Sequence, residues 1–273
     1  FLLTDNGLCI QCFLHEDGKV DPNNGQFKDL IVESAVTNII DFEDAVSIVD
    51  VDDMVDAFRN YMQLIRGDLR AYGSKGNAKS INSDKTYIDV YGNEQKLKGT
   101  CLLSVRNVSL HMYTDVVRVN GKDIPERMLG LLITSFIASK HDQGSNGEEI
   151  NGSDITMPVR GPNSAKSFIY QVTPKLNTSQ EVAEQMNIFA FLEDNLGIRS
   201  GSILIGIMNE ELGMTLQLPE ALNASKDRTF FINTGFLDRT GSQIRAQMYA
   251  GPVDLRDDLT QARYNTSYEL HNV

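Results

Sequence analysis

The chain has 273 residues, of which 41% are hydrophobic and 23% charged, an ordinary globular composition with enough length for a sizeable core. Its net charge of −12 repels nucleic acid and anionic membranes, so neither is an expected partner. The sequence contains no run of roughly 18 apolar residues, shows no signal peptide and has only three cysteines. These features predict a cytoplasmic protein.

The first segment, residues 1–34, begins with Phe1 rather than Met and contains the strand-like stretch GLCIQCFL. Cys9 and Cys12 form a CxxC motif in this stretch. Three-residue spacing in a strand places the two thiols on opposite faces, and neither a second pair nor a histidine stands at zinc spacing. The motif therefore favours a structural role over a metal or redox site.

Five short apolar runs predict strands. They are rich in Ile, Val, Leu or Phe and lack clean polar alternation, which is typical of strands buried on both faces of a parallel sheet. The runs are residues 35–44, 101–109, 167–175, 202–211 and 229–238.

Helical patterns lie between the strands, at residues 49–67, 124–140 and 178–197. Thr178 and Glu181 have the spacing of a capping box, and Thr240 and Gln243 repeat that spacing after the last apolar run. The resulting β-α-β order predicts an α/β fold with parallel crossovers.

Two segments interrupt this order. Residues 71–99 contain one strand-like stretch, TYIDVYG, between polar turns, and we expect a small inserted β segment there. Residues 141–166 are rich in Gly, Asn and Ser, a composition that predicts a mobile surface loop.

Charged side chains stand at the ends of the predicted strands. Glu210 ends the fourth run, Asp238 the fifth and Arg106 the second. Parallel strands present their carboxyl ends at one edge, where ligands bind. Two neighbouring carboxylates repel unless a cation lies between them, and hard oxygen ligands favour Mg²⁺. A magnesium ion with the planar fork of Arg106 suits a small keto or aldehyde acid.

Other readings of these residues stay open. A single acid after a strand often caps the next helix, and Asp44, Asp50 and Asp52 fit capping or solvation. Lys175, after the third run, fits a functional base or phosphate contact as well as a solvated side chain. The four histidines share no spacing, so no catalytic histidine is expected.

The stretches GIMNEE, NTGFLDRTG, DFEDAV and LLSVRNVS resemble the malate synthases, specifically the long G isoform, across essentially the whole chain. The resemblance implies a partial TIM (β/α)8-type barrel, with about five of eight strands, over residues 35–70 and 100–273. Residues 1–34 and 71–99 would belong to the inserted domain, and the N-terminal and C-terminal helical domains would be absent.

The resemblance also implies an activity: condensation of acetyl-CoA with glyoxylate to give malate and CoA. Glu210 and Asp238 would ligate Mg²⁺, and Arg106 would hold glyoxylate and stabilise the enolate. Backbone N–H groups of Phe236, Leu237 and Asp238 would bind the glyoxylate carboxylate.

Other residues would act around this centre, or depart from the family pattern. Asp41 and Glu43 would form a second shell through waters on the metal. The family's enolising base is an Asp beyond the equivalent of Val273, and no residue here matches it. Departures near the site suggest altered substrate choice or weaker coenzyme A binding. They are found at Ala45, Ser109, Leu110, His111, Leu176, Asn177, Thr178, Asn209, Leu212 and Gly213.

Two other functions remain to be weighed against the synthase. A malyl-CoA or citramalyl-CoA lyase would share the barrel, metal and acids, although the LDRTG context favours the synthase. A catalytically silent metal-binding or assembly module would need no base. Open barrel edges predict self-association in either case.

Overall fold

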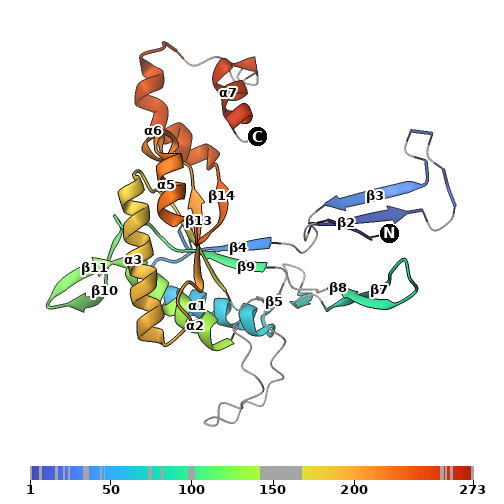
Figure 1. The fold of residues 1–273 in the computed structure, drawn as a ribbon, viewed down its shortest axis with the longest axis horizontal. Coiled ribbons are helices and arrows are strands. Elements are labelled where there is room, and N and C mark those ends of the chain that lie inside the picture. Colours follow the sequence, from blue (N-terminus) through green and yellow to red (C-terminus); the bar gives the residue numbers. More distant parts are fainter. Residues whose placement is uncertain are drawn as a thin grey trace, which may run out of the picture. The chain divides into compact units, whose positions relative to one another are not determined.

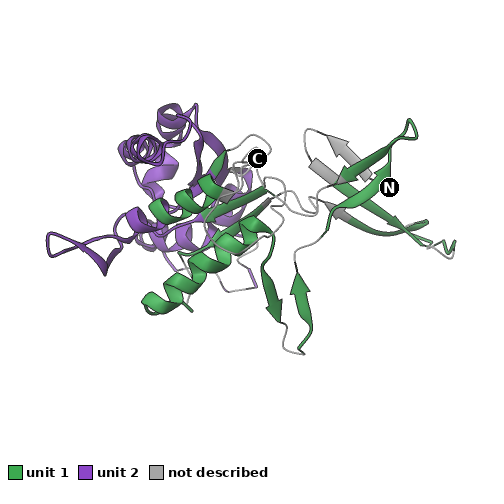
Figure 2. Ribbon diagram, turned by 90° about the horizontal axis from the view of Figure 1, so that it is seen from below, with its two compact units in different colours: residues 1–105, 132–169 green, residues 106–131, 170–273 purple. Residues whose placement is uncertain are grey.

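The protein is described by a computed structural model that covers all residues except 1, 6–7, 16–17, 21, 24, 33–36, 44, 46, 73–75, 81–82, 98–101, 142–167, 253–254, 256, 259–260 and 272–273. The predicted mobile loop therefore lies outside the described residues, apart from His141. The chain divides into two compact units (Figure 2). One contains residues 1–105 and 132–169, and the other residues 106–131 and 170–273.

All five predicted strands of the parallel sheet are confirmed (Figure 1). They are β4 (Thr37–Asp41), β9 (Leu102–Arg106), β12 (Ile169–Thr173), β13 (Ile203–Met208) and β14 (Thr229–Asn233). Their order in the sheet is β14-β13-β12-β9-β4, and β13 and β14 pair in parallel. The sheet formed by the described residues is open, as expected of part of a barrel.

The centre of the sheet forms the core, whereas its edge does not. Fully buried side chains come from β9, β12 and β13: Val105, Val172, Ile203, Ile205 and Ile207. The prediction that every run is covered on both faces is wrong for the two edge strands, since Ile232 of β14 is 41% exposed and Ile39 of β4 is 37% exposed. The reason is position, because β14 and β4 stand at the two ends of the described sheet order and each has a neighbour on one side only.

The helices begin and end largely where the sequence predicts. The helices are α1 (Val51–Arg66), α2 (Glu126–His141), α3 (Ser179–Leu196), α4 (Leu212–Leu216), α5 (Leu218–Ser225), α6 (Phe236–Met248) and α7 (Arg263–His271). Asp50 caps α1, and Thr178 with Glu181 forms the expected capping box of α3, which packs beside α5. None of the described helices is long and apolar enough to cross a membrane.

The capping role predicted for Thr240 is wrong. Helix α6 begins at Phe236, with Gly235 as its N-cap, so Thr240 lies inside the helix. There its hydroxyl donates a hydrogen bond to the Phe236 carbonyl, one turn earlier, at 3.0 Å. The loop between β14 and α6 is thus only two residues long, and Asp238 falls in the first helical turn rather than at the strand end.

The remaining strands form small antiparallel sheets. β1 (Leu2–Asp5), β2 (Leu8–Leu14) and β3 (Phe27–Val32) make one of them. The segment predicted as one short β insertion contains two: β5 (Arg70–Tyr72) with β6 (Ala78–Ser80), and β7 (Lys85–Ile88) with β8 (Glu94–Leu97). The hairpin of β10 (Tyr113–Val119) and β11 (Lys122–Pro125) was not predicted at all.

Candidate functional site

Glu210 is buried two residues after the end of β13. Its side chain is fully buried, and its Oε1 accepts a hydrogen bond of 2.8 Å from the backbone N–H of Lys175. Lys175 follows β12 with a φ of 53°, a left-handed conformation that costs energy for a residue other than glycine. The loop after β12 therefore holds the Glu210 carboxylate in place.

Gly235 is the second element that positions Glu210. A Cβ at this glycine would lie 2.7 Å from the Glu210 Cβ and even closer to its Oε2. No side chain larger than hydrogen fits there unless Glu210 moves. The close approach of the α6 N-cap to Glu210 thus explains why glycine stands at position 235. This role of Gly235 was not predicted from the sequence.

Asp238 lies beside the same lysine. Its Oδ2 is 3.5 Å from the Lys175 Nζ, and both side chains are partly exposed. Lys175 therefore contacts Glu210 through its backbone and Asp238 through its ammonium group. The sequence had left open whether this lysine is functional or solvated, and the geometry places it between the two predicted metal ligands.

The predicted glyoxylate contacts belong to the same unit. Arg106 is the last residue of β9, at the carboxyl edge of the sheet. Phe236 and Leu237 have exposed side chains, and their backbone N–H groups stand in the first turn of α6. The N-cap Gly235 offers no side chain to these N–H groups, so the helix start suits an anion.

Arg239 is a site residue that sequence reasoning missed. It is 3% exposed, and its Nη2 donates a hydrogen bond of 2.6 Å to the carbonyl of Asn209, the residue before Glu210. The ring of Tyr268, in α7, lies 5.8 Å from the guanidinium, and its hydroxyl donates to the Thr234 carbonyl at 2.7 Å. These contacts fix α6 and α7 against the ends of β13 and β14.

Asp41 and Glu43 belong to the other unit. Asp41 ends β4, and its Oδ1 accepts a hydrogen bond of 3.0 Å from the backbone N–H of Glu43. Their second-shell role remains a prediction, and Asp44 lies outside the described residues.

The donor set at Glu210 and Asp238 fits a hard divalent cation. Both residues offer carboxylate oxygens, the ligands that Mg²⁺ prefers, and the Lys175 ammonium beside Asp238 would compete with the ion. No group of three or more His, Cys, Asp or Glu side chains suited to a metal occurs in the part of the chain that the structure describes. Two carboxylates do not fill the shell of Mg²⁺, which in proteins usually keeps several waters.

The CxxC motif lies on β2, as predicted. Cys12 is a buried free thiol, while the side chain of Cys9 is outside the described part.

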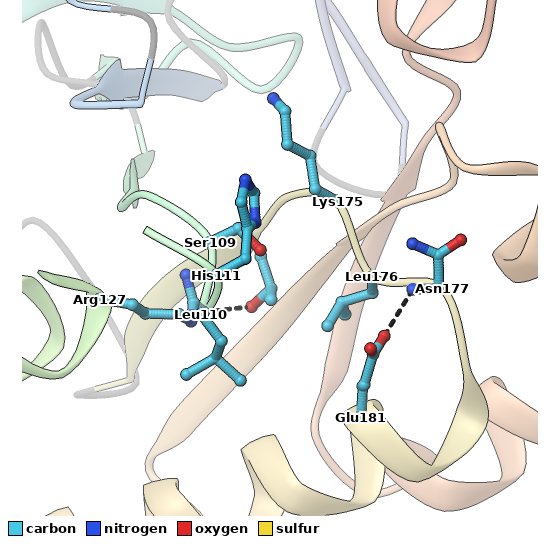
Figure 3. Close-up of a pocket in the computed structure, with 9 residues that line it drawn as sticks. Ser109, Leu110, His111, Arg127, Lys175, Leu176, Asn177 and Glu181 are labelled. Atoms are coloured by element: carbon cyan, nitrogen blue, oxygen red, sulfur yellow. Dashed lines mark hydrogen bonds between the residues drawn. The ribbon is translucent and has the colours of Figure 1, made fainter. Parts of the chain in front are cut away.

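A small pocket adjoins Lys175 (Figure 3). It has a volume of about 180 Å³ and lies between the residues that follow β9 and those that follow β12. Figure 3 shows Ser109 to His111 on one side and Lys175 to Asn177 on the other, with Glu181 below.

Comparison with known proteins identifies the family. A family model described as "Malate synthase, TIM barrel domain" matches residues 102–273. Over the whole chain, "Malate synthase G" of Halalkalibacterium halodurans is 37% identical, that of Corynebacterium efficiens 36% and that of Corynebacterium glutamicum 35%. The chain spans about a third of the length of these relatives, 36%, 35% and 36% respectively. The chain belongs to the malate synthase family, and its residues 102–273 belong to the TIM barrel domain of that family.

Proposed function

We propose that this chain carries the metal- and glyoxylate-binding part of a malate synthase, which condenses acetyl-CoA with glyoxylate to give malate and CoA in a Mg²⁺-dependent reaction. The observation that supports the proposal most is the pair of acids after β13 and β14, both in contact with Lys175. Both acids lie within the stretch that matches the barrel domain of the family.

In this proposal Glu210 and Asp238 hold the magnesium ion. When bound, Mg²⁺ polarises the glyoxylate carbonyl and makes its carbon more electrophilic. Arg106 holds the substrate oxygens with its planar fork and offsets the negative charge of the enolate formed from the acetyl group. The N–H groups of Phe236, Leu237 and Asp238, at the start of α6, hold the glyoxylate carboxylate. By the family resemblance, Asp41 and Glu43 would orient water molecules near the ion.

The buried environment of Glu210 suits this role. Glu210 is fully buried and accepts a hydrogen bond from the Lys175 N–H, and a divalent cation would further offset the cost of burying its charge. Because Gly235 lets α6 begin against Glu210, Asp238 and the free N–H groups of the first turn are brought to the same edge as Glu210. One edge of the sheet thus offers both the carboxylate oxygens for a cation and the donors for an anion.

Glyoxylate binding in the presence and absence of Mg²⁺, measured by calorimetry, tests the proposal. We expect binding that requires Mg²⁺ and is abolished in both Glu210→Ala and Asp238→Ala. Glu220→Ala, an exposed position on α5, serves as the matched control and should behave as the parent chain. Mg²⁺-dependent binding that survives in both site variants would refute the assignment.

A second assay follows the release of free thiol from acetyl-CoA with Mg²⁺ and glyoxylate present. It distinguishes an active enzyme from a catalytically silent module. Turnover would exclude a silent metal-binding module. Glyoxylate binding without thiol release would favour it.

A further inference from the structure

The pocket beside Lys175 contains three deeply buried polar side chains. Arg127 from α2 is fully buried, Thr173 is 1% exposed and Ser109 is 5% exposed. Buried polar groups carry a cost that must be offset by hydrogen bonds, so three of them around one cavity of about 180 Å³ indicate a built site rather than a packing gap.

Two hydroxyl groups in the lining of the pocket, those of Thr173 and Ser109, can donate hydrogen bonds to a ligand. Arg127 donates from Nη2 to the Thr173 Oγ1 at 2.6 Å and from Nη1 to the Val108 carbonyl at 3.2 Å. Because a guanidinium only donates, Thr173 accepts with its oxygen and keeps its own O–H for another acceptor. The Ser109 hydroxyl makes no hydrogen bond within the described part of the chain, so it too can donate to a ligand.

The charges around the pocket are mostly positive. Arg127 and Lys175 are cations, although the Lys175 ammonium also pairs with Asp238, and the exposed imidazole of His111 lies at the rim. The one acid in the lining, Glu181, is engaged by the backbone, since its Oε2 accepts from the N–H groups of Asn177 at 2.6 Å and Thr178 at 3.1 Å. The lining thus has two cations and one acid, and in a chain with a net charge of −12 this balance favours an anion.

The volume of the pocket limits the size of the anion that it can bind. Pockets for drug-sized ligands and cofactors have volumes of roughly 300–1,000 Å³, well above the volume found here. The pocket therefore accommodates one oxyanion group on a small molecule and is too small for a nucleotide.

We propose that the pocket lined by Ser109, Arg127, Thr173 and Lys175 is an oxyanion site that takes the carboxylate or phosphate group of a small acid. It is separate from the N–H groups of α6 proposed for glyoxylate, and it shares Lys175 with the acids Glu210 and Asp238. The inference rests on the pocket's own residues and stands without the proposed metal site.

Calorimetric titration of the full chain without Mg²⁺ tests this site. The probes are inorganic phosphate and succinate, and succinamide is the uncharged control of the same shape as succinate. We expect at least one anion to bind and succinamide not to bind. Ser109→Ala and Thr173→Val should each weaken anion binding about tenfold, because each removes one donor to a charged group. Thr173→Ser keeps the hydroxyl and should bind like the parent chain.

The two anions distinguish the two kinds of ligand. Tighter binding of phosphate would indicate that the natural ligand is a phosphate ester, and tighter binding of succinate that it is a carboxylic acid. Equal binding of succinamide, absence of binding by both anions, or unchanged anion affinity in both Ser109→Ala and Thr173→Val would overturn the proposal. Should Thr173→Val fail to fold, Ser109→Ala decides alone. Loss of Mg²⁺ binding elsewhere in the chain would not alter any of these results, so the two proposals fail separately.

Discussion

At the scale of single residues, Lys175 connects the features of the site. It holds Glu210 with its backbone, pairs with Asp238 through its side chain and lines the neighbouring pocket. The sequence alone predicted that Glu210 and Asp238 follow neighbouring strands, because parallel strands share an edge, although Asp238 lies in the first turn of α6 rather than at a strand end. It could not place Lys175, since its left-handed backbone conformation after Pro174 is set by the surrounding fold.

Replacing Lys175 tests its competition with a cation. The ammonium lies 3.5 Å from the Asp238 Oδ2, where it repels a divalent ion. Lys175→Met should strengthen Mg²⁺ binding by roughly tenfold or more, because a doubly charged ion doubles the repulsion of about 1 kcal/mol between unit charges about 4 Å apart in water. Lys175→Arg keeps the positive charge and should leave the affinity near that of the parent chain. Weaker or unchanged Mg²⁺ binding in Lys175→Met, measured by calorimetry, would contradict this role.

Arg106→Lys separates the shape of the guanidinium from its charge. Lysine keeps the positive charge but loses the planar fork that binds a carboxylate with two hydrogen bonds. We expect glyoxylate affinity in the presence of Mg²⁺ to fall about tenfold, the cost of one lost charge-assisted hydrogen bond. Arg59→Lys, on α1, is the control and should bind glyoxylate normally. Parent-like affinity in Arg106→Lys would show that only the charge matters.

At the scale of elements, the strands of the central sheet were predictable, whereas the β10–β11 hairpin and the start of α6 were not. Apolar runs revealed β4, β9, β12, β13 and β14, because buried strands of a parallel sheet have a strong compositional signal. The hairpin β10–β11 was missed because most of its side chains are exposed, which leaves no buried pattern to read. The start of α6 was misplaced because Gly235 offers no side-chain cap and Thr240 offers a misleading one.

Gly235→Ala tests the contact between α6 and Glu210. The new Cβ would lie 2.7 Å from the Glu210 Cβ, so Glu210 or the helix must move. Overpacking of this kind typically costs about 1–3 kcal/mol, and we expect a lower melting temperature together with weaker Mg²⁺-dependent glyoxylate binding. The control is Gly241→Ala in the same helix, where a Cβ meets nothing within 4 Å and should stabilise by about 0.5–1 kcal/mol. Equal melting temperatures for the two variants would refute the steric account.

Glu193 connects α3 to the start of β13 through hydrogen bonds, and its ionisation should make the stability of the fold depend on pH. Burial raises the pKa of this carboxyl, but hydrogen bonds from Arg228 and from the backbone N–H groups of Ile203 and Gly201 outweigh it and hold the pKa below its usual value of 4.5. The ionised pair therefore stabilises the fold above the pKa of the unfolded chain. This contribution is lost as the pH falls through the lower pKa of the folded state.

Arg228→Met measures that contribution. It leaves the buried Glu193 without its bidentate partner, whose Nη2 donates to Oε2 at 2.9 Å. We expect the free energy of unfolding at pH 7 to fall by about 3–5 kcal/mol, and by less at acid pH, where Glu193 takes up a proton. Denaturant unfolding at both pH values checks this. The exposed pair Arg118 and Asp123 offers a control, since Arg118→Met should change stability by less than about 1 kcal/mol. A loss for Arg228→Met that does not depend on pH would contradict the assignment.

At the scale of the whole molecule, the physical pattern predicted an α/β fold and the sequence resemblance predicted the family. The α/β fold and the family were predicted and are confirmed, whereas the roles of individual residues remain proposals. The difference has a physical reason. Fold follows from many apolar positions that act together, but a metal site depends on the placement of a few side chains within a few tenths of an ångström.

The most direct test locates a divalent ion. Crystals of the chain grown with glyoxylate and Mn²⁺, an anomalous scatterer that replaces Mg²⁺, would show where the ion binds. We predict one strong anomalous peak between Glu210 and Asp238, with a carboxylate oxygen of each residue roughly 2.1 Å from it. Clear density for both side chains with no peak between them, or a peak ligated by other residues, would contradict the magnesium site on which the proposed function depends.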